Sequence, residues 1–392
     1  MVLFSCQTEK PDSREFPIIR TLEVVDVDST GATFQGELVK KGIRTNTTYG
    51  FVWDANEPDI DSSYTVILGE VFNSSFFKIR IDHSLAKGLE YNVRAFATQE
   101  SKRIYGNNIK FISKGSSKNA WSLEKAGIQL DVTEPSYGSS TDVAGCIIFP
   151  FRVVYFYNPE KNELTKSPYF PISGSRYTLY TGVSIGNIQY VFNNSDNNIY
   201  KFQSDSWTKV TTAPFYYGEH TIYYGFSISD NIFFISSRLS YMYSLTNNTW
   251  QQLAAISIDY PYSILVGTNI NNKAYIITTD KSIWEYNTEN NTWTKKTSYP
   301  GILHDKIISF SYNGKLYFGL SYHSHTEYYN WFDRELWIYD PVSDKWSKTQ
   351  KFPMNLINGD LFFFYLKNKL YIGHQDDKTY NIWKFDPASA AI

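Results

Sequence analysis

Trp207, Trp250 and Trp293 recur at a spacing of 43 residues, and this repeat limits the folds open to the chain more than any other feature. Each tryptophan ends a unit in which two aromatic residues alternate with other residues before a polar turn, as in "WEYNTENNTW". The register extends back to Leu164 and, after a unit ten residues longer, forward to Trp346. A β-rich repeat of this length corresponds to one small sheet, which buries its faces only by stacking on its neighbours.

The two ends of the repeat complement each other. The last unit runs through "IWKFDPASAAI" and lacks an outer strand, whereas Trp121 stands 43 residues before Leu164 without inner strands of its own. We therefore predict that the segment around Trp121 pairs with Tyr380–Phe385 as the outermost strand of the last unit. This pairing closes the ring and leaves no open sheet edge.

Residues 114–392 resemble the kelch family of β-propellers, whose units carry an aromatic pair, an Asp turn and a Trp, as in "WIYDPVSDKW" here. The family's Gly-Gly doublet is reduced to single glycines at Gly319 and Gly373. The resemblance implies a six-bladed propeller closed by its N-terminal strand. Asn-Asn-Thr triplets at Asn247 and Asn290 match glycosylation sequons, but they recur in the same turn and we interpret them as turn residues.

Residues 17–113 alternate short apolar and polar runs, a pattern typical of a β-sandwich. The run "LAKGLEYNVRA" from Leu85 resembles the signature of fibronectin type III domains. The resemblance implies that the Tyr91 hydroxyl bonds to backbone a few residues upstream. Trp53 is expected to supply the core aromatic, because Phe34 replaces the family's usual tryptophan. We predict an all-β chain in which this domain acts as a spacer without catalytic residues.

Cys6 follows Leu3-Phe4-Ser5, which resembles the lipobox of bacterial lipoproteins, and residues 1–16 have the polar composition of a tether. The resemblance implies a lipid on Cys6 as the sole membrane attachment, at the outer membrane or cell surface, with a periplasm-facing orientation as the alternative. Cys146, within the apolar run "GCIIF", is expected to be a buried core thiol.

Charge excludes one class of partner. The chain has 37 basic and 39 acidic residues, with a net charge of −2, and no basic cluster interleaves with its aromatic residues. Nucleic acid is therefore not an expected partner.

The connections from the outer strand of one unit to the inner strand of the next are expected to reach the rim of a central channel. The twelfth residue after each marker should lie there, and neighbouring residues add further polar groups. The predicted rim residues are Thr133, Arg176, Glu219, Tyr262, Asp305 and Asn358, with His220, His304, Lys306 and Asp360 beside them.

The longer unit carries its extra residues between the second and third strands, on the face expected for the rim connections. Its flat aromatic rings and nearby hydrogen-bonding groups suit sugar stacking or a peptide partner, although the loop could instead fold over its own propeller. The candidate residues are His323, His325, Tyr328, Tyr329, Trp331, Phe332, Asp333 and Arg334.

Two functions remain open. The sequence favours a non-catalytic cell-envelope module that holds a glycan or a partner protein, since it contains no catalytic motif. The alternative is a sugar mutarotase, because six-bladed kelch-like proteins include sialic-acid mutarotases, with acid and base groups from Glu219, His220, His304 and Asp305 and with Arg176 nearby. No cofactor is expected, and His323 and His325 lack the carboxylate cluster that a metal site would add.

Overall fold

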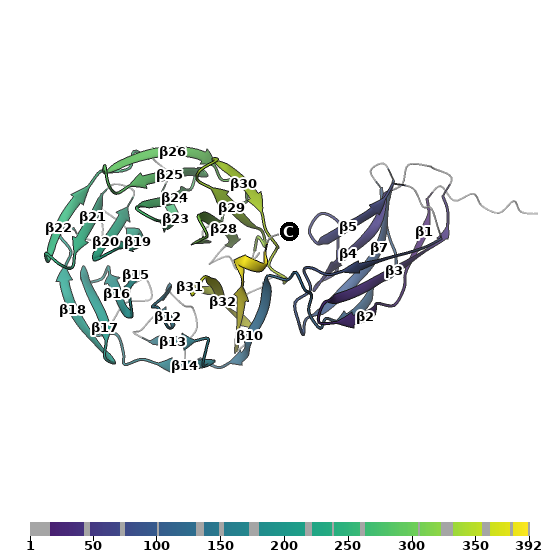
Figure 1. Cartoon of the computed structure of the whole chain (residues 1–392), viewed down its shortest axis with the longest axis horizontal. Helices are drawn as coiled ribbons and strands as arrows, with labels where there is room; N and C mark the ends of the chain where they lie inside the picture. Colours follow the sequence, from purple (N-terminus) through teal and green to yellow (C-terminus); the bar gives the residue numbers. More distant parts are fainter. Residues whose placement is uncertain are drawn as a thin grey trace, which may run out of the picture. The chain divides into compact units, whose positions relative to one another are not determined.

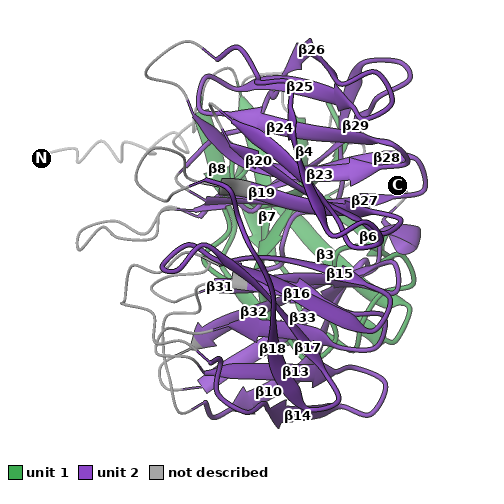
Figure 2. Cartoon of the chain, turned by 90° about the vertical axis from the view of Figure 1, so that its left-hand side faces the viewer, with its two compact units in different colours: residues 1–119 green, residues 120–392 purple. Residues whose placement is uncertain are grey.

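The computed structural model describes most of the chain. The described residues are 16–42, 48–70, 75–99, 102–130, 137–148, 153–171, 180–215, 222–236, 239–258, 263–304, 306–322, 332–354, 361–376 and 379–390. The chain divides into two compact units, Met1–Asn119 and Ala120–Ile392, which Figure 2 distinguishes by colour.

Unit 1 (Met1–Asn119) contains two antiparallel sheets. In the first, β3 pairs with β1, β2 and β6; in the second, the order is β5-β4-β7-β8 and β9 pairs with β7. The strands are β1 (Ile18–Thr21), β2 (Val25–Asp28), β3 (Gly31–Lys40), β4 (Thr48–Asp54), β5 (Tyr64–Gly69), β6 (Phe76–Ile81), β7 (Glu90–Gln99), β8 (Lys102–Tyr105) and β9 (Ile109–Ile112).

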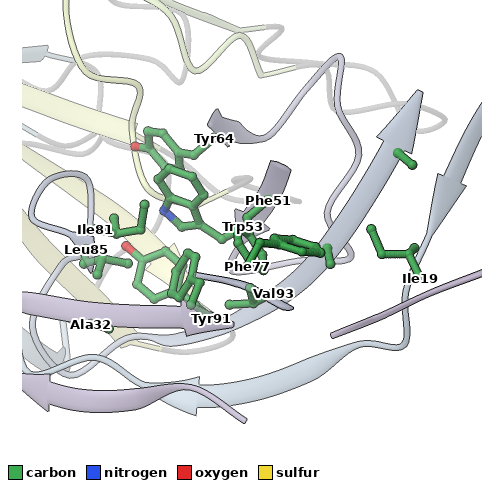
Figure 3. Close-up of a cluster of buried hydrophobic side chains, with 13 residues drawn as sticks. Ile19, Ala32, Phe51, Trp53, Tyr64, Phe77, Ile81, Leu85, Tyr91 and Val93 are labelled. Carbon is green, nitrogen blue, oxygen red and sulfur yellow. The ribbon is translucent and has the colours of Figure 1, made fainter. Parts of the chain in front are cut away.

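Side chains from both sheets of unit 1 form one buried cluster, part of which is drawn in Figure 3. The Trp53 ring is fully buried, stacks on Tyr64 at 5.6 Å and meets Phe34 edge-on at 5.5 Å. The Tyr91 hydroxyl accepts a 2.9 Å hydrogen bond from the Ala86 N–H. The predicted roles of Trp53 and Tyr91 are therefore confirmed.

Unit 2 (Ala120–Ile392) contains six four-stranded antiparallel sheets among its described residues, and Figure 1 shows them arranged around a ring. Five of them follow the chain order. They are β11 (Tyr137–Ser140), β12 (Gly145–Ile148), β13 (Val154–Asn158) and β14 (Glu163–Lys166); β15 (Tyr180–Ile185), β16 (Ile188–Asn193), β17 (Asn198–Gln203) and β18 (Ser206–Thr212); β19 (Ile222–Ile228), β20 (Asn231–Ser236), β21 (Ser240–Ser244) and β22 (Thr249–Leu253); β23 (Ile264–Ile270), β24 (Lys273–Thr278), β25 (Ser282–Asn287) and β26 (Thr292–Ser298); and β27 (Lys306–Tyr312), β28 (Lys315–Tyr322), β29 (Leu336–Asp340) and β30 (Lys345–Lys348).

The sixth sheet joins the two ends of unit 2. Its strand order is β10-β33-β32-β31, formed by β10 (Trp121–Ile128), β31 (Leu361–Leu366), β32 (Lys369–Asp376) and β33 (Thr379–Phe385). Trp121 pairs with Phe385, and the Asp386 N–H donates to the Ala120 carbonyl at 2.8 Å. The predicted pairing of the Trp121 segment with Tyr380–Phe385 is confirmed, so β10 and β33 close the ring.

The repeated turn explains why a tyrosine precedes each marker at a fixed distance. In the sheet β23–β26, the Tyr286 hydroxyl donates to Asn291 Oδ1 at 2.7 Å, and Asn291 has a φ of 55°. The ring of Trp293 packs on Tyr286 at 4.8 Å. Asparagine tolerates the left-handed conformation, so the second Asn of the triplet makes the turn. The same hydroxyl bond links Tyr157 to Asn162, Tyr243 to Asn248 and Tyr339 to Asp344.

Serine hydroxyls connect the inner strands of neighbouring sheets. Ser227 Oγ on β19 donates to the Ser184 carbonyl on β15 at 2.9 Å, and Ser309 Oγ on β27 donates to the Gly267 carbonyl on β23 at 2.6 Å. The same type of bond joins Ser184 to Ser140 and Ser140 to Tyr365. These bonds fix the register between sheets near the centre of the ring.

The fold is nearly all β. The one helical element in the described ranges is the 3₁₀ turn η2 (Pro387–Ser389). Those ranges include no helix with the length and hydropathy needed to cross a bilayer. Cys146 on β12 is fully buried, as predicted, and burial raises the pKa of its thiol.

Candidate functional site

The structure describes only part of the predicted site. Lipidation at Cys6 and most predicted rim and loop positions fall outside the described residues. Those positions are Thr133, Arg176, Glu219, His220, Tyr262, Asp305, His323, His325, Tyr328, Tyr329, Trp331, Asn358 and Asp360. The described candidates are His304, Lys306, Phe332, Asp333 and Arg334.

These five described candidates gather at one end of the sheet β27–β30. Lys306, which begins β27, pairs with Tyr322, which ends β28, and a bridge joins Tyr322 to Phe332. The Phe352 N–H, beyond β30, donates to the Arg334 carbonyl at 2.9 Å. The connections before β27, between β28 and β29, and after β30 therefore leave the sheet at the same end, as the sequence predicted.

The described candidates differ in their exposure. Lys306 is exposed, whereas the His304 side chain is half-buried and its backbone N–H donates to Ser321 Oγ at 2.6 Å. Arg334 is only 6% exposed. Phe332 meets Phe352 edge-on at 5.8 Å. Of these side chains, Lys306 is the most exposed and Arg334 the most buried.

Two carboxylates lie next to Arg334. Burial raises the pKa of the Asp333 carboxyl and the charge of Glu335 raises it further, although the Glu335 N–H, which donates to Asp333 Oδ1 at 3.1 Å, opposes this shift. Glu335 forms ion pairs with Lys351 at 3.2 Å and Lys348 at 3.5 Å. Glu335 is therefore paired with two lysines, whereas the surroundings of Asp333 disfavour its ionised form.

Sequence reasoning missed a group of buried polar atoms at the same sheet. Four uncharged side chains each bury a polar atom that has no hydrogen-bond partner in the described part of the chain. They are Tyr299 (Oη), Trp337 (Nε1), Trp346 (Nε1) and Thr349 (Oγ1). The Tyr299 ring packs on Trp337 and Trp346, so three of these groups are neighbours. Buried polar groups are normally paired, so this grouping requires an explanation.

The marker tryptophans show how unusual this sheet is. Trp207 Nε1 donates to Ser167 Oγ at 3.3 Å, Trp250 Nε1 to Thr211 Oγ1 at 3.3 Å and Trp293 Nε1 to the Ala254 carbonyl at 3.0 Å. Trp121 Nε1 likewise donates to the Gln350 carbonyl at 3.2 Å. Trp346 occupies the corresponding position in β30, yet its N–H is unpaired among the described residues.

A signal for Tyr299 was present in the sequence. In four units an aromatic residue shortly after the outer strand packs edge-on against the next unit's marker, and in three of them it is phenylalanine: Phe170 on Trp207, Phe215 on Trp250 and Phe352 on Trp121. Tyr299 packs in the same way on Trp346 at 5.4 Å. Tyr299 therefore differs from these phenylalanines in its hydroxyl group.

The described side chains near this sheet end are mainly hydrogen-bonding groups. Within the described ranges, no three or more histidine, cysteine, aspartate or glutamate residues cluster closely enough to hold a metal ion. The sheet end supplies indole and hydroxyl donors together with two carboxylate acceptors. Such a mixture suits a ligand rich in hydroxyl groups, each of which both donates and accepts hydrogen bonds.

The comparisons with known proteins concern the fold. No protein-family model matches the chain, and no curated protein matches it. The chain is similar to the solved structure described as "Structure of YjhT", with a TM-score of 0.50 and 13% sequence identity. The match covers 66% of this chain and 95% of that chain. It supports a β-propeller-like fold and, at this identity, nothing about activity.

Proposed function

We propose that this chain is a non-catalytic carbohydrate-binding protein of the bacterial cell envelope. In this proposal the six sheets are the blades of a kelch-type propeller, the N-terminal unit is a fibronectin type III-like spacer, and a lipid on Cys6 provides the anchor. The ligand binds at the end of the sheet β27–β30 where the loop 323–331 begins and ends.

One observation carries the ligand assignment: unpaired polar atoms occur on Trp337 and Trp346 of this sheet, on Thr349 directly after it, and on Tyr299, which packs on Trp346. Leaving a buried polar group without a partner destabilises a fold by about 1–3 kcal/mol. The equivalent phenylalanines and paired tryptophans of the other sheets avoid that loss. A ligand that supplies the missing hydrogen bonds would account for the arrangement.

A carbohydrate fits these groups better than an apolar ligand. Trp337 presents an indole ring with Lys348 Nζ 4.7 Å from its centroid, and Asp333 and Glu335 add acceptors at the same sheet end. Sugars combine apolar ring faces with hydroxyl groups, so they use aromatic rings and such mixed donors and acceptors together.

The test is a glycan array with residues 16–392, followed by calorimetry on each hit. Wild-type protein should retain at least one glycan, and deletion of residues 323–331 should weaken that binding at least tenfold. Lys315→Gln, at the opposite end of the same sheet, is the matched control and should bind like wild type. Retention of peptides with no retention of glycans would reject the carbohydrate assignment in favour of a protein partner.

The same protein preparation tests the alternative that the chain is a mutarotase. Incubation with freshly dissolved single anomers, followed by NMR, should show no acceleration of anomer exchange. Catalysed exchange that is lost in Glu219→Gln or His304→Gln would overturn the non-catalytic assignment.

The anchor has a separate test. Expressed behind a lipoprotein signal peptide, the chain should incorporate a labelled fatty acid and fractionate with membranes, and Cys6→Ser should do neither. Equal labelling of Cys6→Ser would reject the lipid on Cys6.

A further inference from the structure

The Tyr299 hydroxyl lies where the repeat otherwise places a hydrocarbon ring edge. Phe170 and Phe352 are fully buried at the corresponding position, and Phe215 is 5% exposed. Tyr299 itself is 1% exposed, and its Oη makes no hydrogen bond within the described ranges. A phenylalanine would meet the packing requirement at position 299, so packing does not explain why this residue carries a hydroxyl group.

A second unpaired polar atom lies close to that hydroxyl. A Cβ atom added at Gly301 would lie 2.4 Å from Tyr299 Oη and 2.8 Å from Trp337 Nε1. The two polar atoms are therefore at most about 5 Å apart, a separation that one oxygen atom can bridge with two ordinary hydrogen bonds. Only glycine at position 301 lets both side chains reach this place, because any larger residue would displace them.

The surroundings of these atoms define what can bind. Lys281 Nζ donates to the Gly301 carbonyl at 2.8 Å and holds the connection in place. Burial raises the pKa of the Tyr299 hydroxyl, and the charges of Asp333 and Glu335 raise it further. Tyr299 therefore stays protonated and can donate or accept, whereas the Trp337 N–H can only donate. Ile302, the residue after Gly301, is 57% exposed, so the connection that lies against the two atoms reaches the surface.

We infer that Tyr299 Oη and Trp337 Nε1 together hold one hydroxyl group of the bound carbohydrate, at a position that a water molecule fills in the free protein. This inference rests on the proposed function and names two atoms that bind the carbohydrate. A hydroxyl oxygen accepts from the Trp337 N–H and exchanges a hydrogen bond with Tyr299, so both unpaired groups are satisfied by a single ligand atom.

The experiment compares two tyrosine-to-phenylalanine variants. Tyr299→Phe keeps the ring that the repeat requires, so its melting temperature should equal or exceed that of wild type. Its dissociation constant for the best glycan on the array should rise about tenfold, as expected for the loss of one hydrogen bond of about 1.4 kcal/mol. Tyr286→Phe removes a hydroxyl that is bonded to Asn291, so it should lower the melting temperature and leave the dissociation constant unchanged.

The outcomes separate the two proposals. Absence of glycan binding by wild-type protein would reject the proposed function and the ligand assignment with it. Glycan binding by wild type with an unchanged dissociation constant for Tyr299→Phe would reject only this inference. A high-resolution crystal structure of the free protein should show a water molecule bonded to both atoms, and a dry contact between Tyr299, Gly301 and Trp337 would also overturn it.

Discussion

The sheet β27–β30 and its neighbour β23–β26 share one repeat but treat their buried polar groups differently. In β23–β26, Glu285 accepts hydrogen bonds from Lys273 Nζ at 2.6 Å and the Tyr275 hydroxyl at 2.8 Å, and the Trp293 indole is paired. In β27–β30 the indole of Trp346 is unpaired among the described residues, and so are the hydroxyls of Thr349, directly after β30, and of Tyr299, which follows β26 and packs on Trp346. The two sheets therefore share the packing of the repeat, and they differ in whether their buried polar groups have hydrogen-bond partners. We attribute this difference to a role of β27–β30 beyond packing.

The largest expected effect contrasts the two marker tryptophans. Trp293→Ala should lower the free energy of unfolding by about 3–5 kcal/mol, because it removes a large packed ring and a hydrogen bond to the Ala254 carbonyl. Trp346→Ala should cost at least about 1 kcal/mol less, since it also removes an unpaired N–H. Urea unfolding of both variants measures the difference, and equal losses would remove the contrast between the sheets.

A smaller loss of stability is expected when a hydroxyl group like that of Tyr299 is introduced at the equivalent position of another unit. Phe170→Tyr adds an oxygen at the position equivalent to Tyr299, in a fully buried site. The variant should lose about 1–3 kcal/mol of stability, the loss expected for an unsatisfied buried polar group. Thermal and urea unfolding provide the measurement. Unchanged stability would show that any sheet accommodates this hydroxyl, and Tyr299 would then need no ligand to explain it.

The inner strands should not distinguish β27–β30 from an ordinary sheet such as β19–β22. Ser309 on β27 and Ser227 on β19 each donate to a carbonyl of the preceding sheet. Ser309→Ala and Ser227→Ala should therefore each cost about 1 kcal/mol, with no difference between them. A much larger or smaller loss for Ser309→Ala, measured by urea unfolding, would show that the anomaly of β27–β30 extends to the centre of the ring.

Much of the fold could be predicted because its determinants are local and repeated. The turn that joins Tyr286, Asn291 and Trp293 is encoded within eight residues, so its spacing is visible in the sequence. The ring closure followed from Trp121 being in register without inner strands, and the pairing of β10 with β33 confirms it. The Tyr91 hydrogen bond to Ala86 was likewise implied by a short motif.

The site was harder to predict because its signal is a missing partner. Whether the Tyr299 hydroxyl is paired depends on Gly301, Trp337 and other residues that only the folded sheet brings together. Sequence reasoning weighed loop residues such as Tyr328 and Trp331, which fall outside the described residues, and it did not consider the residue packed on each marker. Comparing Tyr299 with Phe170, Phe215 and Phe352 would have identified the exception.

The smallest expected effect is a difference in pH dependence between the two sheets. Burial alone would raise the pKa of Glu285, but hydrogen bonds from Lys273 and Tyr275 lower it, so its contribution to stability is present at neutral pH and lost on acidification through the lowered pKa. Burial raises the pKa of Asp333, so its contribution has the opposite sign: it is present in acid and lost as pH rises through the raised value.

Glu285→Gln should therefore be less stable than wild type at pH 7, and Asp333→Asn at least as stable. Both differences should shrink as the pH falls toward 4, in urea unfolding measured at several pH values. A loss of stability at pH 7 for Asp333→Asn as large as that for Glu285→Gln would mean that both carboxylates are equally well satisfied, and the two sheets would no longer differ in this respect.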